Sequence, residues 1–160
     1  NGFHQQMALA FVQLACGEYK AARESFSIAD HAFSHYEVCK TGWGDALLAD
    51  GEPDAAIEKY REAIAENERT STAWLGWGRA LSRLGRHVQA IEKFERAASW
   101  DPRDPAIYRA WAEALEALGR TDKAAGKRRR AAEIERTNGH DAADTVSPST
   151  VPRARLSAVR

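Results

Sequence analysis

The sequence predicts an all-α solenoid of about four stacked helical hairpins, and three observations support that fold class. The first is a period of 34 residues that runs through most of the 160-residue chain. The second is the helical spacing of apolar residues within a period, and the third is a glycine that recurs between the two helices of each period. Each period is therefore expected to form one helix–turn–helix unit. Neighbouring units are expected to stack, because one hairpin cannot bury its apolar stripes alone.

Four series of residues keep the 34-residue step in register with one another. A tryptophan holds one phase in three consecutive periods, and a glycine and two alanines hold other phases in four. The series are Trp43, Trp77 and Trp111; Gly17, Gly51, Gly85 and Gly119; Ala22, Ala56, Ala90 and Ala124; and Ala29, Ala63, Ala97 and Ala131. Four parallel series in one register indicate an internal repeat. The tryptophans, at a fixed helical phase, are interpreted as core packing rather than as a binding feature.

Helix boundaries are clearest around the third period. Apolar side chains recur at helical spacing on either side of Gly85, and a glycine there can adopt the left-handed conformation that ends a helix. The apolar residues are Trp74, Trp77, Leu81 and Leu84 before the turn, and Val88, Ile91, Phe94, Ala97 and Ala98 after it. Asp104 can cap the next helix, with Pro105 in its first turn. Small residues at Gly44, Gly78 and Ala112 are expected where the two helices of a hairpin approach closely.

The period at 71–104 resembles the tetratricopeptide repeat. The matching residues are Trp74, Trp77, Gly78, Leu81, Gly85, Ala90, Phe94, Ala97 and Pro102, with Trp77 and Leu81 in place of the usual Leu and Tyr. The neighbouring units fall at 3–36, 37–70 and 105–138, so the resemblance covers about 136 residues of the chain. Lys40 replaces the first aromatic residue in the second unit, and Arg128 replaces the second-helix aromatic in the fourth. The resemblance implies a right-handed superhelical solenoid.

These boundaries give a repeat domain over 1–138 and a C-terminal tail over 139–160. Residues 138–152 are rich in Asn, Gly, Asp, Ser, Thr and Pro, and we expect the tail to be a linker, a disordered segment or a partner-binding segment. Charge is unevenly distributed between the two ends. Residues 1–119 carry 13 Lys and Arg against 18 Asp and Glu, a net −5, whereas residues 120–160 carry 10 against 5, a net +5. Opposite ends of two copies can therefore attract each other, which allows a self-assembling array.

The resemblance also implies a concave groove, lined by the first helix of each hairpin, that binds a peptide or a protein partner. The candidate groove residues are Met7, Phe11, Asp45, Leu48, Arg79, Arg83, Arg109 and Glu113. The arginines can hold an acidic side chain through bidentate hydrogen bonds, although an ordinary solvated helix face is the alternative. One subset of the family grips chaperone C-termini with a lysine and asparagine clamp. Met7, Phe11 and Gly42 stand at the matching positions and cannot form that clamp.

A basic cluster follows near the end of the repeats, at Lys127, Arg128, Arg129 and Arg130. The cluster is interpreted either as the solvated cap of the stack or as a docking patch for an acidic partner. Nucleic acid is not the expected ligand, because no aromatic residues are interleaved with these cations.

Catalysis leaves little trace in the sequence. Gly42-x-Gly44 and Gly76-x-Gly78 lie inside predicted helices and do not form dinucleotide loops. His31, His35 and Cys39 have a metal-compatible spacing but straddle a predicted turn and lack a fourth ligand. We therefore expect a non-catalytic interaction scaffold or adaptor without cofactor or metal. The alternatives are a regulatory or substrate-docking segment of a larger bacterial enzyme, such as a transferase, and the self-assembling array. No window is apolar enough to span a membrane, and a cytoplasmic location is expected.

Overall fold

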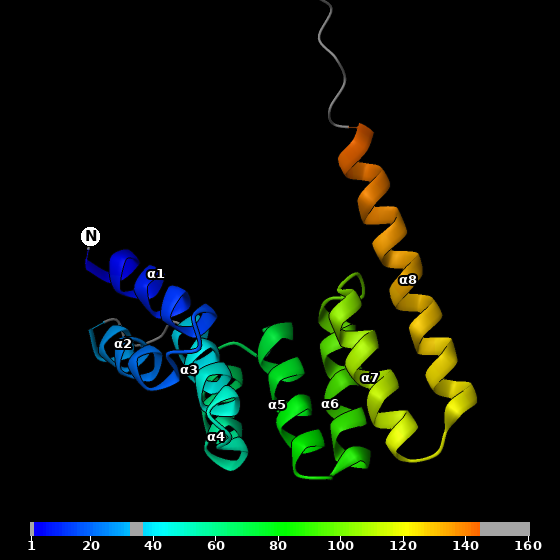
Figure 1. The fold of residues 1–160 in the computed structure, drawn as a ribbon, viewed down its shortest axis with the longest axis horizontal. Helices are drawn as coiled ribbons and strands as arrows, with labels where there is room; N and C mark the ends of the chain where they lie inside the picture. The colour runs from blue at the N-terminus through cyan, green and yellow to red at the C-terminus, as the bar shows by residue number, and fades with distance from the viewer. Residues whose placement is uncertain (1, 33–36, 145–160) are drawn as a thin grey trace, which may run out of the picture.

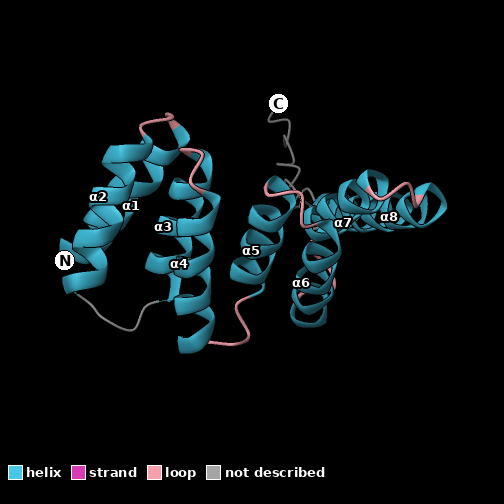
Figure 2. Cartoon of the chain, turned by 90° about the horizontal axis from the view of Figure 1, so that it is seen from below, coloured by secondary structure: helices cyan, strands magenta, loops and turns pink. Residues whose placement is uncertain are grey.

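The computed structural model describes residues 2–32 and 37–144, and their regular structure is α-helical throughout. The helices are α1 (Gly2–Ala15), α2 (Tyr19–Ala32), α3 (Glu37–Ala49), α4 (Pro53–Glu66), α5 (Ser71–Arg83), α6 (His87–Trp100), α7 (Pro105–Ala117) and α8 (Thr121–Asp144). Consecutive helices pair as hairpins, which follow one another in chain order from α1 to α8 (Figure 1). Short loops join the two helices of each hairpin (Figure 2). The all-α helical-repeat solenoid expected from the 34-residue period is confirmed.

The recurring glycines end the first helix of each hairpin. Gly17, Gly51, Gly85 and Gly119 all have positive φ angles, between 71° and 86°. At the third turn the Gly85 N–H donates to the carbonyl of Ser82 at 3.0 Å, and the Arg86 N–H donates to Leu81 at 2.9 Å. Side chains with a Cβ rarely adopt this backbone conformation, so the turn requires glycine. The predicted cap at Asp104 is also present, with its side chain accepting from the Ala106 N–H at 2.8 Å.

Aromatic rings inserted against glycines hold neighbouring helices together. The fully buried ring of Tyr60 lies between Gly44 of its own hairpin and Gly76 of the next. Phe94 lies against Gly78 in the same way, and Phe26 lies against Gly42 of the following repeat. Because glycine has no side chain, the helix axes can approach until the ring touches backbone. The same contacts therefore close the hairpins and stack the repeats, as the small residues at Gly44 and Gly78 predicted.

A lysine of each of the last three hairpins lies over the tryptophan of the same hairpin. The pairs also follow the 34-residue step: Lys59 on Trp43 at 4.3 Å, Lys93 on Trp77 at 4.4 Å and Lys127 on Trp111 at 3.2 Å, measured from ammonium nitrogen to ring centroid. An ammonium group over an indole face is attracted by the ring quadrupole. The other parts of these rings pack on the core, in agreement with the packing role expected for the tryptophan series.

The last helix is longer than the sequence suggested. We expected the repeat domain to end at 138, but α8 continues to Asp144. Alanines favour helix in this stretch, and the first proline that follows is Pro148, so no backbone N–H is missing. Asn138 is held by the Arg103 guanidinium at 3.2 Å. The rest of the expected tail, 145–160, lies outside the described residues. Among the described helices, none is both long and apolar enough to cross a lipid bilayer.

Candidate functional site

A cleft of about 610 Å³ lies between the first helices α3, α5 and α7. Five of the eight predicted groove residues line it: Asp45, Leu48, Arg79, Arg83 and Glu113. The other lining residues are Ala49, Ser82, His87, Phe94, Ala110 and Ala114. The 34-residue register therefore brings side chains from three consecutive repeats to one hollow.

The cleft combines an apolar floor with charged walls. Leu48, Phe94 and Ala114 are buried and form the apolar part. Arg79 and Glu113 are exposed, so charges of both signs face the solvent above the floor. A ligand that fits this surface must present an apolar segment and a charged group together.

Asp45 is the most constrained of the charged groups. Its Oδ1 accepts a hydrogen bond from the Tyr60 hydroxyl at 2.7 Å. Burial raises the pKa of Asp45, while that hydrogen bond and the positive charge of Arg79 act in the opposite direction. Burial, with the neighbouring Asp45 carboxylate, also raises the pKa of Tyr60. The aromatic ring that locks two repeats together therefore also orients a carboxyl group at the cleft.

Several polar groups at the cleft have no partner among the residues that the structure describes. Neither Arg79 nor Arg83 has a carboxylate within the 4.0 Å of an ion pair there, although the charge of Arg79 acts to lower the pKa of Asp45. The Ser82 hydroxyl oxygen and His87 Nδ1 are buried without a hydrogen-bond partner in the described part of the chain. Buried polar atoms normally have a partner, so these two atoms are exceptions to the usual pattern among the described residues.

The remaining predicted groove residues do not line this cleft. Met7 is buried in the core of the first hairpin, and its sulfur accepts from the Cys39 thiol at 3.4 Å. Phe11 is 43% exposed, and its ring packs edge-on against Phe26 with 5.1 Å between centroids. Arg109 turns to α8, where it forms an ion pair with Glu135 at 2.6 Å. Spacing alone did not reveal these three contacts, which depend on side-chain rotamers and on partners in other helices.

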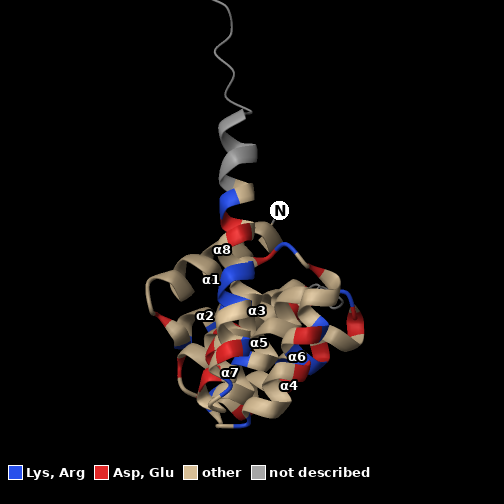
Figure 3. Ribbon diagram, turned by 90° about the vertical axis from the view of Figure 1, so that its right-hand side faces the viewer, with Lys and Arg blue, Asp and Glu red and all other residues tan. Residues whose placement is uncertain are grey.

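The basic cluster on α8 is largely paired within the molecule. Lys127 lies over Trp111, and burial lowers its pKa, an effect that the charge of a glutamate on α6 opposes. Arg128 pairs with a glutamate of α7 at 2.5 Å, and Arg130 pairs with a glutamate one turn later in α8 at 2.9 Å. Arg129 is exposed. Figure 3 shows blue and red segments interleaved along α8. This arrangement favours the solvated-cap interpretation over an open cationic patch.

Potential metal ligands do not gather in the described residues, where no group of three or more His, Cys, Asp and Glu side chains is placed to hold an ion. His31 Nδ1 is 2.8 Å from the Ser27 carbonyl. Cys39 is buried, and burial raises its pKa to about 11, with Asp30 adding to the effect. His35, the third member of the metal spacing considered above, lies outside the described residues. The two Gly-x-Gly sequences are inside α3 and α5.

A stack of helical hairpins defines a helical-repeat protein, and this stack has an open, charged cleft. The tetratricopeptide repeat family model matches residues 41–105. The structure titled "Crystal structure of MamA" is 25% identical, with a TM-score of 0.74 over 88% of this chain and 82% of the other. The thermophilic tetratricopeptide protein TTC0263 of Thermus thermophilus is 20% identical, with a TM-score of 0.78 over 83% and 74%.

A third structure, the first tetratricopeptide domain of Spaghetti (RPAP3) bound to the HSP90 peptide SRMEEVD, is 18% identical. Its TM-score is 0.68 over 73% of this chain and 93% of the other. No curated protein is a significant match in sequence. Residues 41–105 therefore match the tetratricopeptide repeat model, and the stack as a whole has the fold of these tetratricopeptide proteins.

Proposed function

We propose that this chain is a non-catalytic scaffold or adaptor that binds a peptide segment of a partner protein in the cleft between α3, α5 and α7. The observation that carries the proposal is the convergence of Asp45, Leu48, Arg79, Arg83 and Glu113 on one hollow. These residues come from three repeats and are separated in sequence by up to two full periods. An extended or helical segment that follows the cleft can contact all three first helices at once.

The chemistry of the cleft favours a segment with an acidic side chain next to aliphatic ones. Arg79 and Arg83 are one helical turn apart on α5, so their guanidinium groups lie on the same side of the helix. Without ion-pair partners in the described residues, both can form bidentate hydrogen bonds with a carboxylate. Leu48, Phe94 and Ala114 offer an apolar floor for the flanking residues. Hydrogen bonds to charged groups contribute roughly 1.5–3 kcal/mol each, enough to make the acidic residue decisive.

Affinity capture from a lysate of the native host tests the proposal. The full chain carrying Arg79→Glu and Arg83→Glu is compared with wild type and with Arg96→Glu. Arg96 is exposed on α6 and outside the cleft, so Arg96→Glu controls for the effect of a charge reversal elsewhere on the surface. We expect a stoichiometric protein that is retained by wild type and by Arg96→Glu and is lost from the double variant. Equal retention by all three chains would contradict binding in the cleft.

A direct measurement with synthetic peptides then tests the chemistry. Cys16 is exposed and Cys39 is buried, so a fluorophore can be attached at Cys16, away from the cleft. Short peptides that differ only in a central Glu, Gln or Lys among aliphatic residues are the ligands. We expect Glu to be preferred over Gln by about tenfold, the equivalent of about 1.4 kcal/mol. The preference should disappear in the double variant, and a preference for Lys would contradict the role given to the arginines.

A further inference from the structure

Among the residues that the structure describes, no helix covers the outer face of α1, whereas the equivalent face of each later first helix is covered. Three positions show this difference: Gln5, Ala8 and Val12, all of which are exposed, Val12 by 60%. The residues one, two and three periods later are all buried. They are Cys39, Gly42 and Ala46 in α3; Ala73, Gly76 and Ala80 in α5; and Ile107, Ala110 and Ala114 in α7. The face that mediates stacking in three repeats is therefore open in the first.

The three internal interfaces show what fits such a face. At each one, the second helix of the preceding hairpin packs on the first helix of the next. The ring of Phe26 lies against Gly42, and the ring of Tyr60 lies against Gly76. Ala8 occupies the same phase as these glycines, so the open face has a small residue where a ring is received. Leu9 and Val12, both exposed, provide apolar surface beside it.

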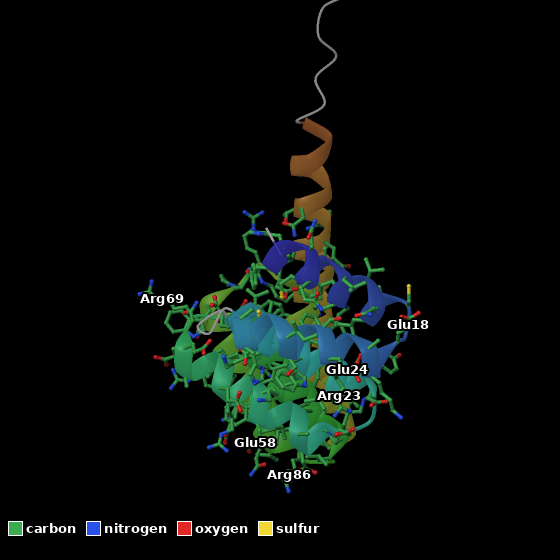
Figure 4. The ribbon with its side chains drawn as sticks, turned by 90° about the vertical axis from the view of Figure 1, so that its left-hand side faces the viewer. Glu18, Arg23, Glu24, Glu58, Arg69 and Arg86 are labelled. Atoms are coloured by element: carbon green, nitrogen blue, oxygen red, sulfur yellow. The ribbon has the colours of Figure 1, made fainter. Side chains whose placement is uncertain are left out.

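The composition of α1 also indicates a covered helix. Residues 2–15 contain no Lys, Arg, Asp or Glu, whereas a helix that faces water normally has a charged side. Figure 4 views this end of the stack, with α1 and α2 nearest the viewer and Glu18 at their turn. A terminal repeat normally has a polar outer face, which keeps the stack from associating further. The outer face of α1 includes Gln5 but no charged side chain.

At the other end of the stack, α8 has a paired arginine at the position where the earlier second helices have an aromatic ring. Arg128 holds the phase of Phe26, Tyr60 and Phe94, and it is exposed and paired with Glu116. Docking α8 of a second copy onto α1 would bury this guanidinium against apolar surface and break its ion pair, at a large desolvation cost. Pairing of two α1 helices about a two-fold axis joins only one helix from each copy. Specific, stable interfaces bury about 1,200 Å² or more, so two 14-residue helices alone are a small basis for one.

We propose that the outer face of α1, formed by Gln5, Ala8, Leu9 and Val12, is a docking surface for another hairpin of the same repeat class. The docking helix is the second helix of that hairpin, and it places an aromatic ring against Ala8 with small residues one turn to either side. In the three later repeats the equivalent face is the stacking interface, and this face of α1 holds the same positions of the 34-residue repeat. The charged cleft lies on other residues, so this surface is separate from the peptide site.

A chain with one added hairpin tests the proposal. A copy of residues 71–104 is placed directly before residue 3, so that the new junction reproduces the natural junction between 104 and 105. The added second helix then presents its own copy of Phe94 to Ala8, in the way that Tyr60 meets Gly76. We expect one cooperative unfolding transition with a higher midpoint than the parent, and α1 amides that exchange with solvent more slowly by about tenfold or more.

Val12→Glu is the matched perturbation, with Val88→Glu in the original α6 as its control. Both valines are exposed to similar extents, 60% and 56%. In the extended chain Val12→Glu should remove the gain in midpoint and the protection of α1, whereas Val88→Glu should leave both. In the parent chain Val12→Glu should not change the midpoint, because nothing covers the residue there. A separate transition for the added hairpin with unprotected α1 amides would overturn the proposal, as would a parent dimer that Val12→Glu dissociates.

Discussion

Replacing Gly78 with alanine should destabilise the stack, and the structure provides Gly126 as a matched control. A Cβ at Gly78 would lie 2.7 Å from Cδ1 and 3.0 Å from Cζ of the Phe94 ring. That ring is fully buried and cannot move without displacing its neighbours. A Cβ at Gly126, which is also inside a helix, would meet nothing within 4 Å.

The magnitude follows from two opposing effects. Alanine is more favourable than glycine inside a helix by about 1 kcal/mol, and both variants gain this amount. Overpacking of a close-packed contact costs roughly 1–3 kcal/mol, and only Gly78→Ala incurs this cost. Gly126→Ala should therefore stabilise the fold by about 1 kcal/mol, whereas Gly78→Ala should have a net effect between neutral and about 2 kcal/mol of destabilisation. Gly78→Leu should be worse by a few kcal/mol.

Urea unfolding at neutral pH, followed by far-ultraviolet circular dichroism and by tryptophan fluorescence, measures both variants. The difference between them isolates the overpacking cost, because the backbone contribution is common to both. We expect Gly126→Ala to be more stable than Gly78→Ala by about 1–3 kcal/mol. Equal free energies of unfolding would mean that Phe94 does not pack on Gly78, and the helix register described above would be wrong.

Three further predictions concern titratable groups. Burial raises the pKa of Asp45 in the folded chain, so its contribution to stability is full below the ordinary pKa of 3.8 and is lost as the pH rises through the raised pKa. Asp45→Asn should flatten this decline in the free energy of unfolding, measured by urea unfolding at several pH values. Parallel pH profiles of the variant and the parent would contradict this prediction. At pH 8 a thiol reagent should react rapidly with Cys16 alone, because the Cys39 pKa is about 11; two fast thiols would refute this. Lys40→Ala should cost about 2–3 kcal/mol by leaving two part-buried carboxylates unpaired, and an unchanged melting midpoint would argue otherwise.

The fold could be predicted because its determinants are local and repeated. A turn glycine needs only a positive φ, so Gly51 and Gly85 identify helix ends without knowledge of any distant contact. The 34-residue step then relates positions that lie together in the stack. The end of α8 was harder to predict, because a polar stretch without proline is compatible with either a helix or a coil. The lysines over the tryptophans also repeat every 34 residues, and that recurrence was the available signal for them.

The helical phase of the cleft residues could be predicted from the sequence, but their ion-pair partners could not. Helical phase placed Asp45, Arg79 and Glu113 on the same side of successive first helices, and all three line the cleft. Whether an arginine is open or paired depends on the rotamers of residues far apart in sequence. Arg109 is at the phase expected for a groove residue, yet Glu135, 26 residues later, holds it through an ion pair. No pattern within one repeat contains that information.

Hydrogen–deuterium exchange of the chain, with and without its captured partner, tests most directly whether the cleft is the binding surface. The account predicts slower exchange in α3, α5 and α7, strongest around 45–49, 79–83 and 110–114, with the exchange of α8 unchanged. The same experiment with the Arg79→Glu and Arg83→Glu chain should show no protection. Protection confined to α8, or to α4 and α6, with the first helices unaffected, would contradict the account and place the partner on another face of the stack.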